Sequence, residues 1–208
     1  MTGAPVAPYD GFVSATQAAI RELFAASVRA KETFLAEQAA DLERAIDLVA
    51  DAFASGHKVL LFGNGGSAAD AQHIAAEWTG RFIRERRPMA AIALTTDTSA
   101  LTAIGNDYGY DEVFARQVRA LGARDDVVIA NSTSGKSPNV LRAVDAARAL
   151  GMRVIGLTGG DGGTLASVVD VSLRVSASTL SPRIQETHIL IGHVICELVD
   201  RRLFGDGS

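Results

Sequence analysis

Five short apolar runs, each followed by a stretch with helical character, constrain the fold of this chain more than any other feature. The runs are KVLLFG at 58–63, AAIAL at 90–94, DVVIAN at 126–131, RVIGLTG at 153–159 and DVSLRV at 170–175. Strands that alternate with helices need crossover connections, which place helices on both faces of a parallel sheet. The sequence therefore predicts an α/β fold with a doubly wound, five-stranded parallel sheet.

Helical segments flank this region on both sides. Residues 14–55 are rich in Ala, contain no Pro and repeat apolar residues at three- and four-residue steps, which fits two helices. The 208 residues are expected to form one domain over 1–208, with a helical extension at about 14–55 and an α/β core at about 56–208. Residues 181–203 predict a helix whose middle is apolar almost all the way round, and burial of this helix against another subunit would make the protein a homo-oligomer.

Composition excludes several classes of protein. A net charge of −4 argues against a nucleic-acid coat, and the densest basic run, Arg81–Arg87, is interpreted as the solvated end of a helix. Cys196 is the single cysteine, so no internal disulfide can form, and we expect it to be buried. The amino terminus lacks a signal-peptide pattern, and the longest apolar run is too short to span a bilayer. A cytoplasmic protein with neither nucleic-acid nor membrane partners is expected.

Two loops rich in Gly and Ser follow predicted strands. The first, Gly63–Ser67, leads into a helix in which Ser67 and Asp70 have capping-box spacing. The second, Ser132–Ser137, leads into a helix with Pro138 in its first turn. Hydroxyl and backbone N–H donors at a helix start suit a phosphate monoester, although the same residue types also serve as turn and cap residues.

Both loops have nucleotide-binding look-alikes. Residues 63–68 match G-x-G-x-x-A, and Asp97 follows the next strand, where a ribose-binding acid could lie; the match is short. Residues 135–137 imitate the end of a Walker A loop, but Ala130 stands where that motif requires Gly. We therefore favour a small phosphorylated metabolite over a nucleotide.

A histidine and carboxylate pattern follows the first loop. Asp70, His73 and Glu77 project from one helix face, and an i, i+4 His/Glu pair can share a proton or a metal ion, although it is also a common surface pair. His193 lies among apolar residues of the last helix, either as a satisfied core histidine or as a site residue. Gln185 lies eight residues earlier, about 12 Å along the helix axis. The two side chains can share one ion only if it lies between them at full stretch, or if a second subunit helps to build the site.

Taken together, these residues resemble the phosphoheptose isomerases, also called sedoheptulose 7-phosphate isomerases, of the sugar isomerase (SIS) fold. The resemblance runs from about residue 15 to 204, through GNGGSAADAQHIAAE at 63–77, ALTTDTSALTAIGNDYGYDEVFARQV at 93–118, NSTSGKSPNV at 131–140 and RIQETHILIGH at 183–193. It implies a flavodoxin-like sheet and a cytoplasmic homotetramer with active sites near subunit interfaces.

The resemblance also implies an aldose–ketose isomerase that converts sedoheptulose 7-phosphate to D-glycero-D-manno-heptose 7-phosphate through an enediol. Such an enzyme supplies heptose to lipopolysaccharide, capsule or another glycoconjugate. Glu77 would be the general base and His193 the general acid. One zinc ion per subunit would lie on His73, Glu77, Gln185 and His193. Substrate contacts would come from Asn64, Gly65, Gly66, Ser67, Asn106, Asp107, Ser132, Thr133, Ser134, Ser137 and Gln185.

Two other functions remain open from the sequence. A non-catalytic SIS module could bind the bacterial replication initiator or sense a sugar phosphate. A relative of this kind lacks the carboxylate and the histidine that this chain has as Glu77 and His193. A dinucleotide enzyme would instead show saturable binding of NAD.

Overall fold

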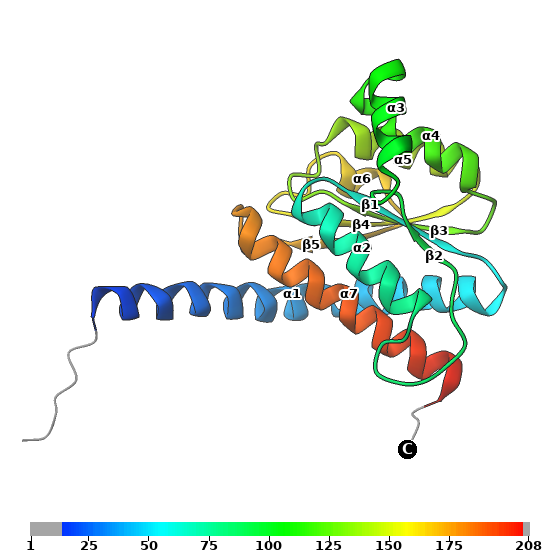
Figure 1. Cartoon of the computed structure of the whole chain (residues 1–208). Coiled ribbons are helices and arrows are strands. Elements are labelled where there is room, and N and C mark those ends of the chain that lie inside the picture. The colour runs from blue at the N-terminus through cyan, green and yellow to red at the C-terminus, as the bar shows by residue number, and fades with distance from the viewer. Residues whose placement is uncertain (1–13, 206–208) are drawn as a thin grey trace, which may run out of the picture.

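The computed structural model describes residues 14–205, and its elements alternate as the apolar runs predict (Figure 1). The amino-terminal residues on which the absence of a signal peptide was judged lie outside this range. In chain order the elements are α1 (Ala15–Ala54), β1 (Val59–Gly63), α2 (Gly66–Thr79), β2 (Ala91–Ala93), α3 (Thr98–Tyr108), the 3-10 helix η1 (Tyr110–Glu112), α4 (Val113–Leu121), β3 (Val127–Asn131), α5 (Pro138–Ala149), β4 (Arg153–Gly159), α6 (Leu165–Val168), β5 (Val171–Val175) and α7 (Ser181–Phe204).

The sheet is five-stranded and entirely parallel, in the order β2-β1-β3-β4-β5. Each strand lies within one of the five apolar runs, so the expected α/β fold class is confirmed. Strands β1 and β3 are neighbours and end together, with Gly63 opposite Asn131. Because the chain order reverses at this pair, the loops that follow the two strands meet where ligands bind in open α/β sheets.

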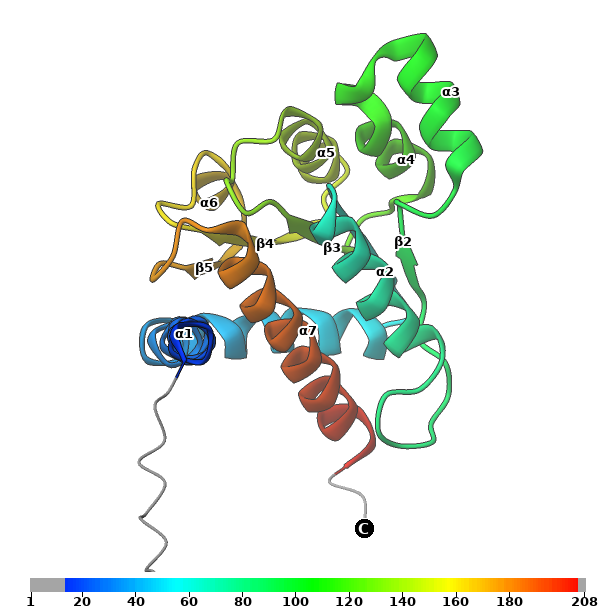
Figure 2. The same ribbon diagram turned by 60° about the vertical axis from the view of Figure 1, so that its left-hand side comes forward.

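Helices cover both faces of the sheet, as Figure 2 shows, and alternate residues of a strand bury against different helices. Val59 and Leu61 of β1 pack in the cluster that includes α1, α2 and α7. Leu60 and Phe62 pack in the opposite cluster, which includes α4 and α5. A parallel strand covered on both faces needs apolar side chains at nearly every position, as in β1 and β3, which are buried throughout. The two edge strands, β2 and β5, alternate in burial instead.

Residues 15–54 form one helix, and the prediction of two helices for this segment was wrong. The segment contains neither Pro nor Gly, the residues that most often end a helix, so it continues for 40 residues, about 60 Å. Its second half packs on α7 and β5, whereas its first half carries exposed apolar side chains at Ile20, Leu23, Phe24 and Val28.

Two local predictions in and after α2 were also wrong. The helix begins at Gly66 with Gly65 as its N-cap, and no side chain caps it, because Ser67 is buried inside the first turn. The basic run 81–87 is a loop after the end of α2, not the solvated end of a helix. Within that loop the side chain of Arg86 is only 2% exposed.

Helix α7 begins at Ser181 with Pro182 in its first turn, and α1 and α2 cover most of its apolar surface. Leu190 and Leu198 remain exposed on it, while Cys196 is buried and free, as expected. Burial raises the pKa of the Cys196 thiol. Among residues 14–205, no helix is both long and apolar enough to cross a membrane.

His188 is the fully buried histidine of α7. Its Nε2–H donates to the carbonyl oxygen of Thr158 at 3.0 Å, and its Nδ1 is buried without a partner. Burial disfavours the charged imidazolium and lowers the pKa of His188 from 6.5 to about 4. The residue is therefore the neutral core histidine of this helix, held by one hydrogen bond through Nε2.

We predict that His188 makes the protein less stable as the pH falls from 6.5 to 4. In this window the unfolded chain takes up a proton that the folded chain does not, so the free energy of unfolding decreases by up to about 3 kcal/mol and is regained above pH 6.5. Urea unfolding at a series of pH values measures this slope. In His188→Gln, whose amide can still donate to Thr158, the slope should be smaller; an equal slope would contradict the assignment.

The loop after β3 packs directly on the loop after β4. Gly135 has a positive φ of 62°, and a Cβ built on it would lie 1.9 Å from the carbonyl oxygen of Gly162. Its own carbonyl accepts a hydrogen bond from the N–H of Leu165. The loop that carries four hydroxyl residues is thus fixed by backbone packing, which only glycine permits at this position.

We expect Gly135→Ala to destabilise the fold far more than Gly56→Ala. Gly56 also has a positive φ, of 81°, but nothing lies within 4 Å of its Cβ position, so its substitution costs only the backbone term of about 1–2 kcal/mol. At Gly135 the clash with the backbone of Gly162 adds about 1–3 kcal/mol. Urea unfolding of both variants at one protein concentration measures the difference, and equal losses would disprove the close approach.

Candidate active site

A reciprocal amide pair joins the two Gly/Ser loops. The side chains of Asn64, in the first loop, and Asn139, in the first turn of α5, each donate to the other at 2.9 Å. The hydroxyl of Tyr110 in η1 donates to the same oxygen of Asn64, at 3.3 Å. Three segments that are distant in sequence therefore converge on Asn64, and they hold both loops at the carboxyl edge of β1 and β3.

The second loop presents hydroxyl groups at the start of α5. Ser132 and Ser137 lie 3.1 Å apart through their Oγ atoms, and Ser137 makes no side-chain capping bond although it is the N-cap residue. Thr133 contacts Ser181 of α7 at 3.4 Å, whereas Ser134 accepts the backbone N–H of Lys136 within the turn. The interpretation as cap and turn residues thus applies to Ser134, while the hydroxyl of Ser137 pairs with Ser132 and does not cap α5.

Charge near this loop is limited. The ammonium of Lys136 lies 3.6 Å from the carboxylate of Asp161, and both side chains are mostly exposed. A hydrogen bond from the N–H of Gly163, followed by the charge of Lys136, lowers the pKa of Asp161. Lys136 therefore has a carboxylate partner, and the loop offers an anion mainly hydroxyls, N–H groups and the positive end of a helix dipole.

Helices α2 and α7 lie side by side and make two close contacts. At their starts, a Cβ on Gly66 would come 2.5 Å from Nε2 of Gln185, so the Gln185 side chain lies over the α2 backbone. In their middles, a Cβ on Gly192 would come 2.5 Å from Cδ1 of Ile74. The lack of a side chain at these glycines lets the two helices approach closely.

This approach brings three predicted site residues together. Nε2 of His73 lies 3.2 Å from Oε1 of Glu77 and 3.0 Å from Nε2 of His193. One ligand atom from each of the three residues lies within 4.8 Å of the others. The cluster opens to solvent, since the side chains of His73 and Glu77 are 49% and 23% exposed. His193 is therefore a member of this cluster, while His188 fills the core position.

The donor set of the cluster suits zinc. Two imidazole nitrogens and a carboxylate oxygen are common zinc ligands, with bonds of about 2.0–2.2 Å. Ligand atoms around a tetrahedral zinc with such bonds are about 3.3 Å apart, close to the 3.0 and 3.2 Å observed here. The three residues can accordingly hold one divalent ion and leave a position for an oxygen ligand.

Other predicted residues lie outside the cluster. Gln185 is placed at Gly66, the opposite end of the helix pair from Glu77. Asp70 lies one turn before His73, and burial raises the pKa of its carboxyl while the charge of His73 opposes this. Asn106 and Asp107 are exposed on α3 and hydrogen-bonded to each other, and Asp97 caps that helix.

The sequence reasoning missed several residues around the cluster. Phe82, in the loop after α2, stacks on the His193 ring with centroids 5.4 Å apart. Asn139 and Tyr110 fix Asn64, and Arg86 of the same loop as Phe82 contacts the end of α2. The only available signal was that these residues fall inside or beside the matched motifs; their contacts depend on the folded chain.

Comparison with known proteins assigns the family. The model of the SIS domain family matches residues 22–159. A phosphoheptose isomerase of Geotalea daltonii is 56% identical over 161 residues, which cover 77% of this chain and 83% of the relative. A phosphoheptose isomerase of a Roseiflexus species is 55% identical over 179 residues, with 86% and 90% covered.

Solved structures agree with these relatives. A phosphoheptose isomerase from Neisseria gonorrhoeae has a TM-score of 0.84 at 49% identity, covering 89% of this chain and 98% of that one. The corresponding protein from Francisella tularensis has a TM-score of 0.86 at 40% identity, with 90% and 100% covered. With its five-stranded parallel sheet and these relatives, the chain belongs to the phosphoheptose isomerase family of SIS-domain proteins and is a sugar-phosphate isomerase.

Proposed function

We propose that this protein interconverts sedoheptulose 7-phosphate and D-glycero-D-manno-heptose 7-phosphate, as a step of heptose biosynthesis. The observation that carries the proposal is the meeting of His73, Glu77 and His193 within 4.8 Å at the junction of two helices. A carboxylate and an imidazole side by side are the acid–base pair that an aldose–ketose shift requires. The shared name of the relatives from Geotalea and Roseiflexus supports the seven-carbon substrate.

The phosphate would bind at the two loops. Ser132, Thr133, Ser134 and Ser137 would donate their hydroxyls to its oxygens, together with backbone N–H groups at the start of α5. The sugar would contact the first loop at Asn64, Gly65, Gly66 and Ser67, and also Gln185, which lies over Gly66. Asn106 and Asp107 complete the proposed contact set, from α3. The carbon chain would then run along α2 towards His73.

Glu77 and His193 would move the two protons of the reaction. From the ketose, the Glu77 carboxylate takes a proton from C1 while the His193 imidazole gives one to the oxygen on C2, which forms the enediol. Glu77 then returns its proton to C2, and His193 takes the proton of the C1 hydroxyl, which leaves the aldehyde. Since Oε1 of Glu77 and Nε2 of His193 both face Nε2 of His73, we assign the carbon-bound proton to Oε2 of Glu77 and the oxygen-bound proton to Nδ1 of His193.

One zinc ion per subunit would be held by His73, Glu77 and His193. When bound, it polarises the carbonyl and hydroxyl oxygens of the substrate. Gln185 is the proposed fourth ligand, but in one chain it lies about 12 Å along α7 from His193. Its side chain would therefore reach the ion from a second subunit, and within its own subunit it would contact substrate at Gly66.

Assembly into a homotetramer is part of the proposal. Exposed apolar residues on the first half of α1, among them Phe24 at 72% exposure, favour burial against other subunits. A groove of about 610 Å³ between α1 and α7 is lined largely by apolar side chains, including Leu35 and Leu198. The only cysteine, Cys196, is free, as expected for a protein of the reducing cytoplasm.

We predict that Glu77→Gln and His193→Gln each lower kcat by about 100-fold or more, because each removes one proton-transfer group. The assay follows conversion of sedoheptulose 7-phosphate by the purified protein, with circular dichroism as a check on folding. Glu85→Gln and His57→Gln change the same residue types outside the cluster and should retain the parent rate. Full activity in either cluster variant would refute its assigned role.

Removal of metal should lower the rate at least tenfold, and added zinc should restore it. Metal analysis should find about one zinc per subunit in the parent protein and little in His73→Ala, while His57→Ala keeps its zinc. A rate that is unchanged after complete metal removal would show that zinc is dispensable. The three residues would then act without an ion.

A further inference from the structure

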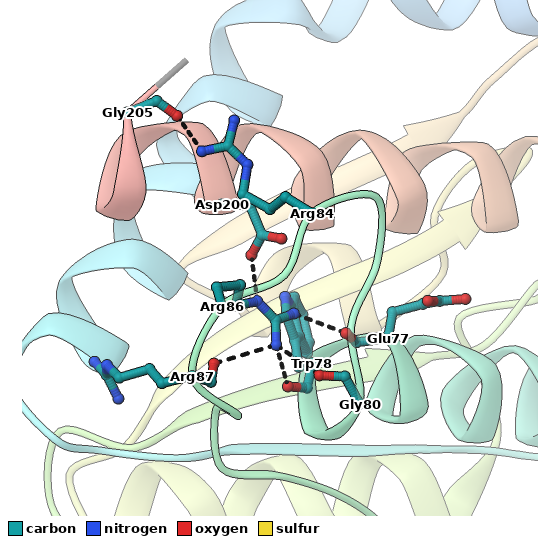
Figure 3. A network of polar contacts seen from close by, with 8 residues as sticks. All are labelled: Glu77, Trp78, Gly80, Arg84, Arg86, Arg87, Asp200 and Gly205. Atoms are coloured by element: carbon teal, nitrogen blue, oxygen red, sulfur yellow. Dashed lines mark hydrogen bonds and ion pairs between the residues drawn. The ribbon is translucent and has the colours of Figure 1, made fainter. Parts of the chain in front are cut away.

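The loop after α2 inserts the side chain of Arg86 between the end of α2 and the last turns of α7 (Figure 3). Nε of Arg86 donates to Oδ1 of Asp200 at 3.0 Å, and both side chains are almost completely buried, at 2% and 4% exposure. A buried ion pair is costly to desolvate and is weak evidence for stability by itself. The other contacts of the Arg86 guanidinium indicate a more specific role.

The guanidinium of Arg86 binds the backbone at the end of α2. The last carbonyls of any helix lack N–H partners within it, and α2 has no basic residue in its last turn. Nη2 of Arg86 donates to the carbonyl of Glu77 at 2.8 Å, and Nη1 donates to those of Trp78 and Gly80 at 2.9 Å (Figure 3). Arg86 therefore satisfies the carbonyl group of Glu77 itself.

The other end of this contact lies on the helix of His193. Asp200 follows His193 by seven residues, two helical turns, so both lie on the α7 face towards α2. The same loop places Phe82 on the His193 ring. A single guanidinium thus connects the backbone of Glu77 to the helix that carries His193.

We propose that Arg86 is a positioning residue for the isomerase reaction. Its planar guanidinium fixes the last turn of α2 against α7 and thereby sets the separation between the Glu77 carboxylate and the His193 imidazole. The inference rests on the proposed function, because it requires these two groups to transfer the protons. Lysine cannot replace Arg86, since an ammonium lacks the planar fork that donates to four carbonyls and a carboxylate together.

The test compares Arg86→Lys with Arg84→Lys. Arg84 lies in the same loop and donates to the carbonyl of Gly205, without contact to the end of α2, so it is a matched control. We expect Arg86→Lys to lower kcat at least tenfold while KM for sedoheptulose 7-phosphate stays within about twofold, because the hydroxyl loop is untouched. Arg84→Lys should behave as the parent. A purely stabilising residue would change the melting temperature but not kcat of the folded enzyme.

A second variant protects the test against loss of folding. The pair Arg86→Met with Asp200→Leu removes both charges, and such replacements of buried ion pairs often preserve stability. Reduced kcat at unchanged KM in this folded variant supports positioning. Parental kcat in either folded variant overturns it, as does failure of both to fold, which would make Arg86 a requirement of the fold alone.

Glu77→Gln in the same assay separates the two proposals. If Glu77→Gln is inactive and Arg86→Lys equals Arg84→Lys, only the positioning role is wrong. If Glu77→Gln is fully active, or the parent has no turnover, the proposed function fails and the role of Arg86 fails with it.

Discussion

The close packing of α7 against α2 determines where the proposed reacting groups lie. Gly192 has no side chain, so Ile74 packs directly against it. The next residue of α7, His193, and the preceding residue of α2, His73, therefore meet, with their Nε2 atoms 3.0 Å apart. Packed interiors resist small displacements, so a contact of this kind fixes a distance well. Near the end of α2, Arg86 contacts both helices through the carbonyl of Glu77 and the carboxylate of Asp200. At the start of α2, Gln185 of α7 covers Gly66. The helix pair is held at three levels, with the His/Glu/His cluster between two of them.

Most of the fold could be predicted because buried parallel strands are continuous apolar runs, a signal that is local in sequence. The predictions of local structure were wrong in two situations. In one, a contact between residues distant in sequence decides the structure; in the other, the sequence contains no residue that marks the end of a helix. The run 81–87 has the charge of a solvated surface, yet the burial of Arg86 depends on Asp200, 114 positions away. Residues 15–54 contain no Pro or Gly that would divide the segment, and they form one continuous helix.

The candidate site was partly predictable for similar reasons. His73 and Glu77 lie one turn apart on a helix, so their spacing alone places them together. His188 and His193 share one apolar helix, and only the fold separates the core histidine from the member of the cluster. The grouping of three ligands is a property of the structure, whereas the zinc ion, the fourth ligand Gln185 and the tetramer remain predictions.

The first half of α1 is largely exposed within the subunit, which bears on the proposed assembly. An isolated helical stretch of about 15 residues is marginal in water, because ordering its backbone is not offset by burial. From Ala15 to Arg29 none of the helix is buried within the subunit, and it exposes Phe24 and Val28. In the proposed tetramer its helicity is coupled to the subunit contacts that cover it. Dilution below the dissociation constant should then fray α1 from its amino end, and amide exchange there should depend on protein concentration while exchange in the sheet should not.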